Sequence, residues 1–170
     1  MRYIIITITL IFNLILQSTL FEYISIIDVK PNSAIVIIIS MAFMRGKTEG
    51  AVTGLIAGLL QDCFFAPYIG FYTFCYILVG YFCGMFFRGF YKETIITPLL
   101  LTAAFDLIFE FVYYVFNILL KGYVDFGFFL KSVILPEVVY TTLISAIIYK
   151  ILYYINSLLE EREKFSQKLF

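Results

Sequence analysis

Long apolar runs, interrupted by charged or turn-forming residues, constrain this chain more than any other feature of its sequence. Runs of about 18–20 apolar residues cross a bilayer as a helix, and only 14% of the residues are charged, whereas soluble domains carry about 25%. The pattern predicts an all-α, polytopic membrane protein with six transmembrane helices in one bundle. The second and third runs are short for a complete crossing, so we expect them to be either tilted or an incomplete hairpin. We expect one transmembrane domain over residues 1–156, with spans at about 3–21, 32–44, 50–66, 68–87, 95–120 and 133–156.

Both termini are expected on the cytoplasmic side of the membrane. The first apolar run is too long for a signal peptide and has no small-residue cleavage site, so we expect an uncleaved first span. Lys and Arg concentrate in cytoplasmic loops, and they divide unequally between the two sides of the six-span arrangement. Nine lie on the side of the termini (Arg2, Arg45, Lys47, Arg88, Lys92, Lys150, Arg162, Lys164, Lys168), and three lie on the other side (Lys30, Lys121, Lys131). The charged segment 157–170 is expected to continue the last helix into the cytoplasm, either as a solvated end or as a docking helix for a partner.

Several classes of function find no support in the composition. The chain has no His and three scattered Cys, so a zinc or haem site is not expected. The net charge is zero and no basic cluster precedes the tail, so nucleic-acid binding is not expected either. The sequence contains no GxSxG motif and no phosphate-binding loop. We therefore expect a protein that is not an enzyme and that holds no metal and no cofactor.

Polar side chains within the apolar runs recur at intervals of four residues, so each set lies along one face of its helix. Polar residues inside a membrane mark helix contacts or cavities, and we expect these faces to meet one another in the bundle. Asp106 and Glu110 are one turn apart, and burying two charges together is costly, so they form either a proton or cation site or a structural network. The predicted intramembrane polar network consists of Asn13, Gln17, Asp106, Glu110 and Glu137.

Glycines form a second regular stripe in a chain that otherwise favours bulky side chains. Small residues four apart let two membrane helices approach closely. The stripe contains Gly46, Gly50, Gly54 and Gly58, and the device is repeated once at Gly80 and Gly84. The stripe packs either against another helix of this chain or against a helix of another protein. Our hypothesis is that a partner's helix lies against Gly46–Gly58.

Gln61 and Asp62 end the glycine-rich span and are assigned to the same predicted interface. A carboxylate near the end of a helix is disfavoured by the negative end of the helix dipole. Asp62 is therefore expected to be solvated, to cap the turn at Phe65-Ala66-Pro67, or to pair with a hydrogen-bond donor.

The order of these motifs resembles the MreD family of rod-shape-determining proteins. The resemblance covers nearly the whole chain, and its specific part lies at residues 45–70. It rests on Gln17-Ser18-Thr19-Leu20 after the first span, Lys30-Pro31 before the second, Gly46…Gly50…Gly54…Gly58-Leu59-Leu60-Gln61-Asp62, and Tyr68-Ile69-Gly70.

The resemblance implies a non-enzymatic scaffold of the bacterial cell-elongation machinery in the inner membrane. It implies binding to MreC, which has a single transmembrane helix, and coupling of MreB filaments to RodA and the elongation penicillin-binding protein. It also implies a fold similar to the substrate-binding components of energy-coupling-factor transporters. Because those components hold a ligand within a six-helix bundle, a small-molecule transporter or capture component with a polar intramembrane pocket is the alternative function.

Overall fold

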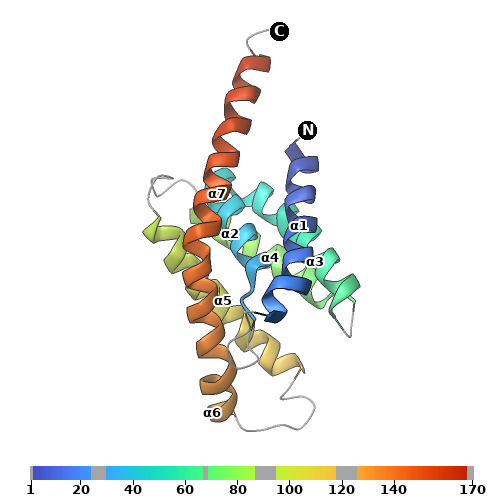
Figure 1. The fold of residues 1–170 in the computed structure, drawn as a ribbon, viewed down its shortest axis with the longest axis vertical. Helices are drawn as coiled ribbons and strands as arrows, with labels where there is room; N and C mark the ends of the chain where they lie inside the picture. Colours follow the sequence, from blue (N-terminus) through green and yellow to red (C-terminus); the bar gives the residue numbers. More distant parts are fainter. Residues whose placement is uncertain (1, 24–29, 67–68, 87–94, 118–125, 168–170) are drawn as a thin grey trace.

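The structure is a computed structural model that describes residues 2–23, 30–66, 69–86, 95–117 and 126–167. All regular secondary structure within these ranges is helical (Figure 1), so the predicted all-α class is confirmed. The helices are α1 (Arg2–Tyr23), α2 (Ser33–Arg45), α3 (Lys47–Phe64), α4 (Phe71–Met85), α5 (Ile96–Asn117), α6 (Phe126–Phe129), a π-helical turn (Leu130–Ile134) and α7 (Leu135–Gln167).

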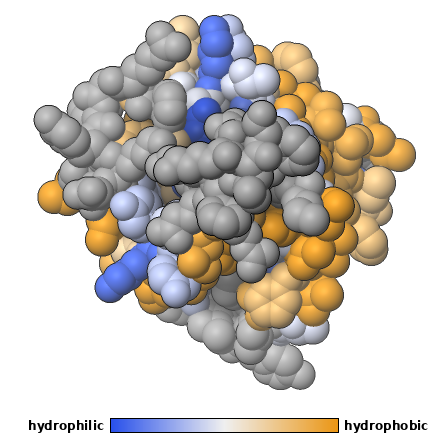
Figure 2. Space-filling model, turned by 90° about the horizontal axis from the view of Figure 1, so that it is seen from above, coloured by the Kyte–Doolittle hydropathy of each residue, from blue (hydrophilic) through white to orange (hydrophobic). Residues whose placement is uncertain are grey.

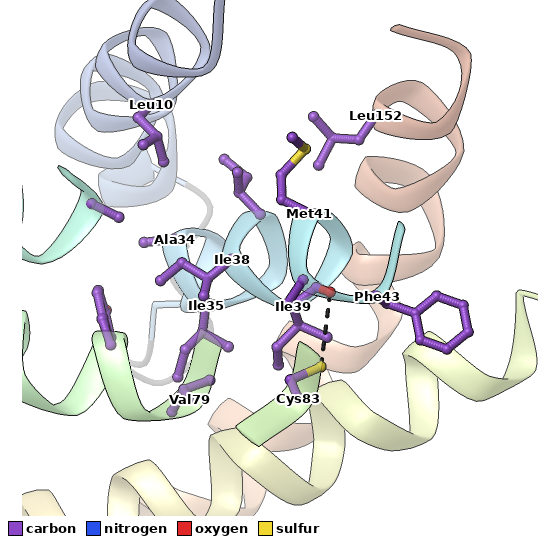
Figure 3. Packing of buried hydrophobic residues seen from close by; sticks show 14 of the residues in the cluster. Leu10, Ala34, Ile35, Ile38, Ile39, Met41, Phe43, Val79, Cys83 and Leu152 are labelled. Atoms are coloured by element: carbon purple, nitrogen blue, oxygen red, sulfur yellow. Dashed lines mark hydrogen bonds between the residues drawn. The ribbon is translucent and has the colours of Figure 1, made fainter. Parts of the chain in front are cut away.

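Helix α2 lies at the centre of the molecule. Every residue from Ser33 to Met44 is buried, and α1, α3, α4, α5 and α7 all contact this helix. Figure 3 shows its isoleucines packed against side chains of the surrounding helices, with the Cys83 thiol 3.8 Å from the Ile39 carbonyl oxygen. A helix that is apolar on all sides is stable only where all its sides are covered. With 13 residues, α2 is about 20 Å long, shorter than the roughly 30 Å of a bilayer's hydrocarbon core.

Asn32 caps the start of α2, and Gly46 ends the helix. At its start, the Asn32 side-chain oxygen accepts a hydrogen bond from the Ile35 amide at 3.3 Å. The helix thus begins at Ser33, and Asn32 rather than Pro31 sits beside its first turn. At its end, Gly46 adopts a φ of 97°, which glycine tolerates because it has no Cβ. The Gly46 amide donates to the Ala42 carbonyl at 2.8 Å and its own carbonyl accepts from the Gly50 amide at 3.0 Å, so one residue ends α2 and starts α3.

The last helical segment is interrupted by a wider turn and then continues without a break. Leu135 donates its amide to the Leu130 carbonyl, five residues back. Pro136 has no amide hydrogen to satisfy the Ser132 carbonyl, which disrupts the α-helical pattern at this point. From Leu135, α7 runs for 33 residues to Gln167, so the helix includes much of the charged tail.

Consecutive helices at the centre of the molecule run in opposite directions. At one end, the start of α1 meets the start of α3, because the Tyr3 hydroxyl donates to the Glu49 carboxylate at 3.2 Å. At the same end, Arg45 at the end of α2 donates to the Asn156 side chain of α7. The start of α2 contacts α4 and α7 through Asn32 instead, near the opposite end. The start of α1 and the end of α7 therefore lie at the same end of the molecule (Figure 1).

The exterior of the bundle is apolar, whereas polar side chains are buried inside. Exposed fractions reach 60% at Phe12, 65% at Phe74 and 67% at Leu100. Seen from the end that holds the termini, hydrophobic side chains cover much of the rim (Figure 2). Two helical stretches, Ile96–Phe116 and Phe126–Leu159, are long and apolar enough to cross a membrane. Apolar surface of this extent is unusual on a soluble monomer and suits helices that face lipid.

Candidate functional site

The most extensive helix contact in the described part of the chain joins α3 to α4, and the predicted glycines lie in it. A Cβ added to Gly50, Gly54 or Gly58 of α3, or to Gly80 or Gly84 of α4, would come within 3.0 Å of main-chain atoms of the opposite helix. Gly50 faces the Gly80 carbonyl and Gly54 faces the Tyr76 carbonyl, while Gly58 lies against the main chain of Thr73. Because the opposing atoms belong to the backbone, no side-chain rotation could make room for a larger residue.

The same contact extends to Gly84, which packs against the main chain of Lys47. Five of the six predicted glycines thus lie in one contact within the chain, and Gly46 forms the turn before it. The face of α3 that we expected to receive another protein's helix is occupied by α4. Packing within the chain, the other interpretation of the stripe, is the one that the geometry matches.

Asp62 is buried, and its carboxylate holds the first turn of α4. Its two oxygens accept hydrogen bonds from the Tyr72 amide at 3.0 Å, the Thr73 amide at 2.9 Å and the Thr73 hydroxyl at 2.5 Å. The first amides of a helix have no partner within the helix, and its positive dipole end favours an anion. Of the three roles considered for Asp62, pairing with donors is the one observed, and the donors come from the next helix. Gln61 is buried beside it, and its carbonyl accepts from the Phe65 amide at 2.9 Å.

Acidic side chains of α5 and α7 meet inside the bundle. Asp106 is fully buried and Glu110 is 5% exposed, and the Glu110 side chain lies beside that of Glu137. No basic side chain among the described residues pairs with these three groups. The faces of the fifth and sixth predicted spans therefore do meet, as their spacing suggested.

Asp106 is the least satisfied member of this acidic cluster, which consists of Asp106, Glu110 and Glu137. The Thr141 side chain faces it, but neither carboxylate oxygen has a partner at hydrogen-bonding distance and angle among the described residues. Within the described ranges, no group of three or more His, Cys, Asp or Glu side chains is placed to bind a metal ion. The cluster lies where α5 and α7 contact each other.

Asn32 connects three helices beside the acidic cluster, and sequence reasoning missed it. Its side-chain oxygen accepts a hydrogen bond from the Tyr76 hydroxyl of α4 at 3.0 Å, and its main-chain amide donates one to the Thr141 hydroxyl of α7 at 3.0 Å. An Asn just before an apolar helix is a recognised capping signal, which could have identified its local role. The rings of Tyr72 and Tyr113 pack against each other nearby, with their centroids 6.2 Å apart, and nothing distinguished these two residues from the chain's other aromatic residues.

Asn13 and Gln17 do not join the acidic cluster, although we expected all the polar faces to meet. The main contacts of α1 are with α2 and α3. Asn13 is 7% exposed and lies beside Ile37 of α2 and Ile148 of α7. The expectation failed because spacing identifies the residues that share a face and does not identify the helix opposite that face.

Comparison with protein families decides the classification. The family model described as rod shape-determining protein MreD matches residues 1–158. The chain belongs to the MreD family. Membership implies a role in rod shape determination. Proteins of the MreD family are structural rather than catalytic.

No curated protein and no solved structure matches this member of the MreD family. Its similarity in fold to the substrate-binding components of energy-coupling-factor transporters therefore stays a prediction. The family match ends at residue 158, next to the predicted start of the charged tail. The Tyr68 position of the resemblance lies outside the described residues, as do the basic residues Arg88, Lys92 and Lys121.

Proposed function

We propose that this MreD-family protein is a six-span scaffold of the bacterial cell-elongation machinery. In this role it binds the single-span protein MreC and helps couple MreB filaments to peptidoglycan synthesis by RodA and the elongation penicillin-binding protein. The observation that carries the proposal is the family match over residues 1–158. The match covers α1 to α6 and most of α7, so the function belongs to the whole bundle.

A multi-pass arrangement in the inner membrane, with both termini in the cytoplasm, is part of this proposal. The alternating helix directions and the common end of α1 and α7 (Figure 1) support an even number of crossings. The nine basic residues on the side of the termini, against three on the other side, support a cytoplasmic location for that end.

The packing suits a scaffold because it leaves little freedom for relative movement of the central helices. The buried α2 is held by five neighbours, and α3 contacts α4 backbone to backbone. Asp62 further ties the end of α3 to the start of α4. A rigid bundle presents its outer surfaces in constant relative positions, which a protein that organises several partners requires.

The direct test is depletion of the protein in its own host, whose cells the proposal expects to be rods. Loss of the scaffold should convert rods into rounded cells, measured as the ratio of cell length to width, and the full-length chain should restore them. MreC should co-purify with the restored protein from solubilised membranes. Rods of normal proportions after complete depletion would contradict the proposed function.

A small-molecule capture protein is the second candidate, and the unpartnered carboxylate of Asp106 favours it. The double variant Asp106→Asn, Glu110→Gln separates the two functions, because both amides retain hydrogen-bonding groups but cannot ionise. For a scaffold we expect normal membrane levels and normal rod growth from the double variant. A variant that inserts at normal levels but no longer supports rod growth would favour a site that depends on ionisation.

A further inference from the structure

A groove separates α1 from α7 on the apolar surface of the bundle. Its volume is about 450 Å³. Ile8 and Phe12 of α1 form one wall, Ile148 and Ile151 of α7 form the other, and Ile37 of the central α2 lies at the floor. Along α1 the groove extends from Ile8 to Leu16, about 12 Å at the helical rise. The start of α1 and the end of α7, the two helices that form the walls, lie at the same end of the molecule (Figure 1).

A polar side chain lies inside this otherwise apolar groove. Asn13 occupies the middle of α1, lines the groove and is 7% exposed. No hydrogen bond joins its side-chain amide to another of the described residues. The nearby Thr9 hydroxyl donates to the Ile5 carbonyl of its own helix at 2.9 Å. One turn further along, the Gln17 side-chain oxygen is also buried without a partner in the described part of the chain.

An unpaired amide at the depth of the lipid tails indicates what should fill the groove. Water is scarce there, and a polar group without a partner is costly in hydrocarbon. A lipid acyl chain would cover the isoleucines but offers no donor or acceptor to the amide. A transmembrane helix supplies both apolar surface and a polar side chain, and Asn side chains join membrane helices through such bonds.

We propose that the groove between α1 and α7 is the docking site for one transmembrane helix of another protein. A polar side chain near the middle of that helix forms a hydrogen bond with Asn13. The inference rests on the proposed function, in which the partner is the single-span protein MreC. A single-span helix is free on every side and can lie against both walls of the groove. The helices of a second copy are backed by their own neighbours and are poorly suited to enter it.

Site-specific photo-cross-linking in intact membranes tests the location. The full-length protein, produced together with MreC, carries a photoreactive amino acid at Phe12 or Ile151 in the groove. The controls carry it at Phe74 on α4 or Ile108 on α5. Their exposed fractions are comparable, at 60% and 55% for the groove positions and 65% and 53% for the controls. We expect adducts with the MreC transmembrane helix from both groove positions and from neither control.

The other outcomes separate the inference from the function on which it rests. If MreC co-purifies but cross-links only at the control positions, the docking site is wrong and the proposed function stands. Adducts from the groove with lipid alone, or with a second copy of this chain, would also overturn the docking site. If MreC does not co-purify with the unmodified protein, both proposals fail.

Substitution of Asn13 tests the role of the amide. Asn13→Leu should weaken co-purification of MreC by about 3- to 20-fold, the range expected for loss of one hydrogen bond between membrane helices. The isolated protein should keep or raise its melting temperature in detergent, because an unpaired buried amide is removed. Asn13→Gln keeps an amide and should retain more partner than Asn13→Leu. A lower melting temperature with unchanged binding in Asn13→Leu would mean that Asn13 serves the fold alone.

Discussion

At the scale of single residues, a few buried polar side chains determine how the apolar helices are joined. Asp62 binds three donors that lie ten and eleven residues further along the chain. Asn32 joins the start of α2 to α4 through its side-chain oxygen and to α7 through its main-chain amide. Each of these contacts satisfies groups that lipid cannot satisfy, so each is worth more to the fold than its small surface suggests.

Replacing Asp62 tests the importance of the cap on α4. Asp62→Ala should lower the free energy of unfolding by about 1–2 kcal/mol, because it leaves the first amides of α4 without an acceptor. Asp62→Asn keeps one acceptor oxygen and should lose less. The measurement is the melting temperature of the purified protein in detergent, with Cys63→Ser as the control at an exposed neighbouring position. Equal melting temperatures for Asp62→Ala and Cys63→Ser would show that the cap contributes little.

At the scale of elements, the hairpin of α3 and α4 depends on two helices that touch through their main chains. The carbonyl of Gly50 faces Gly80, and the carbonyl of Gly80 faces Gly50. Approach at this distance strengthens dispersion contacts and brings carbonyl oxygens near Cα hydrogens. In lipid, where no hydrophobic effect drives helices together, such packing is the main attractive term.

Enlarging a glycine in this contact should push the two helices apart. Gly54→Leu should cost at least about 1–3 kcal/mol, the usual range for overpacking, because the opposing Tyr76 carbonyl belongs to the backbone. Cys63→Leu, an exposed position of the same helix, is the matched control and should be near neutral. Both are compared by melting temperature in detergent and by protein level in membranes. If Gly54→Leu is tolerated as well as the control, the contact contributes little to stability.

At the scale of the whole molecule, the bundle has an apolar exterior, a shielded central helix and polar groups between helices. Polar contacts gather at two levels. One contains Tyr3, Glu49, Arg45 and Asn156 near the ends of the chain, and the other contains Asn32, Asp62 and the acidic cluster. Between these levels the contacts are mainly apolar, which is the arrangement expected of helices that cross a membrane side by side.

The alternating helix directions lead to a prediction about topology. Reporter fusions at residue 28, in the connection between α1 and α2, should report the outer side of the membrane. Fusions at residue 90 and after residue 170 should report the cytoplasm, because the basic residues favour that side. Enzymatic and fluorescent reporters that are active on opposite sides of the membrane provide the measurement. The same side for residues 28 and 170 would contradict the six-span arrangement.

Local patterns in the amino-acid sequence were enough to predict where most of the helices lie and which residues share a face. Apolar runs predicted the positions of α1, α5 and α7, and spacing by four predicted that Asp106 and Glu110 lie on one face. The motif around residues 45–70 was sufficient to identify the family. These features are local, because a helix places residues three or four apart on one side whatever surrounds it.

Which helix faces meet became known only from the packing of the folded chain. The glycine face of α3 contacts α4 instead of another protein's helix, and Asp62 finds its donors on the helix that follows. Asn13 lies in a groove rather than in the acidic cluster, and the short α2 is enclosed by five helices. The partner of a face depends on helix directions, connection lengths and the sum of many weak contacts at once. None of these is encoded in the periodicity of a single span.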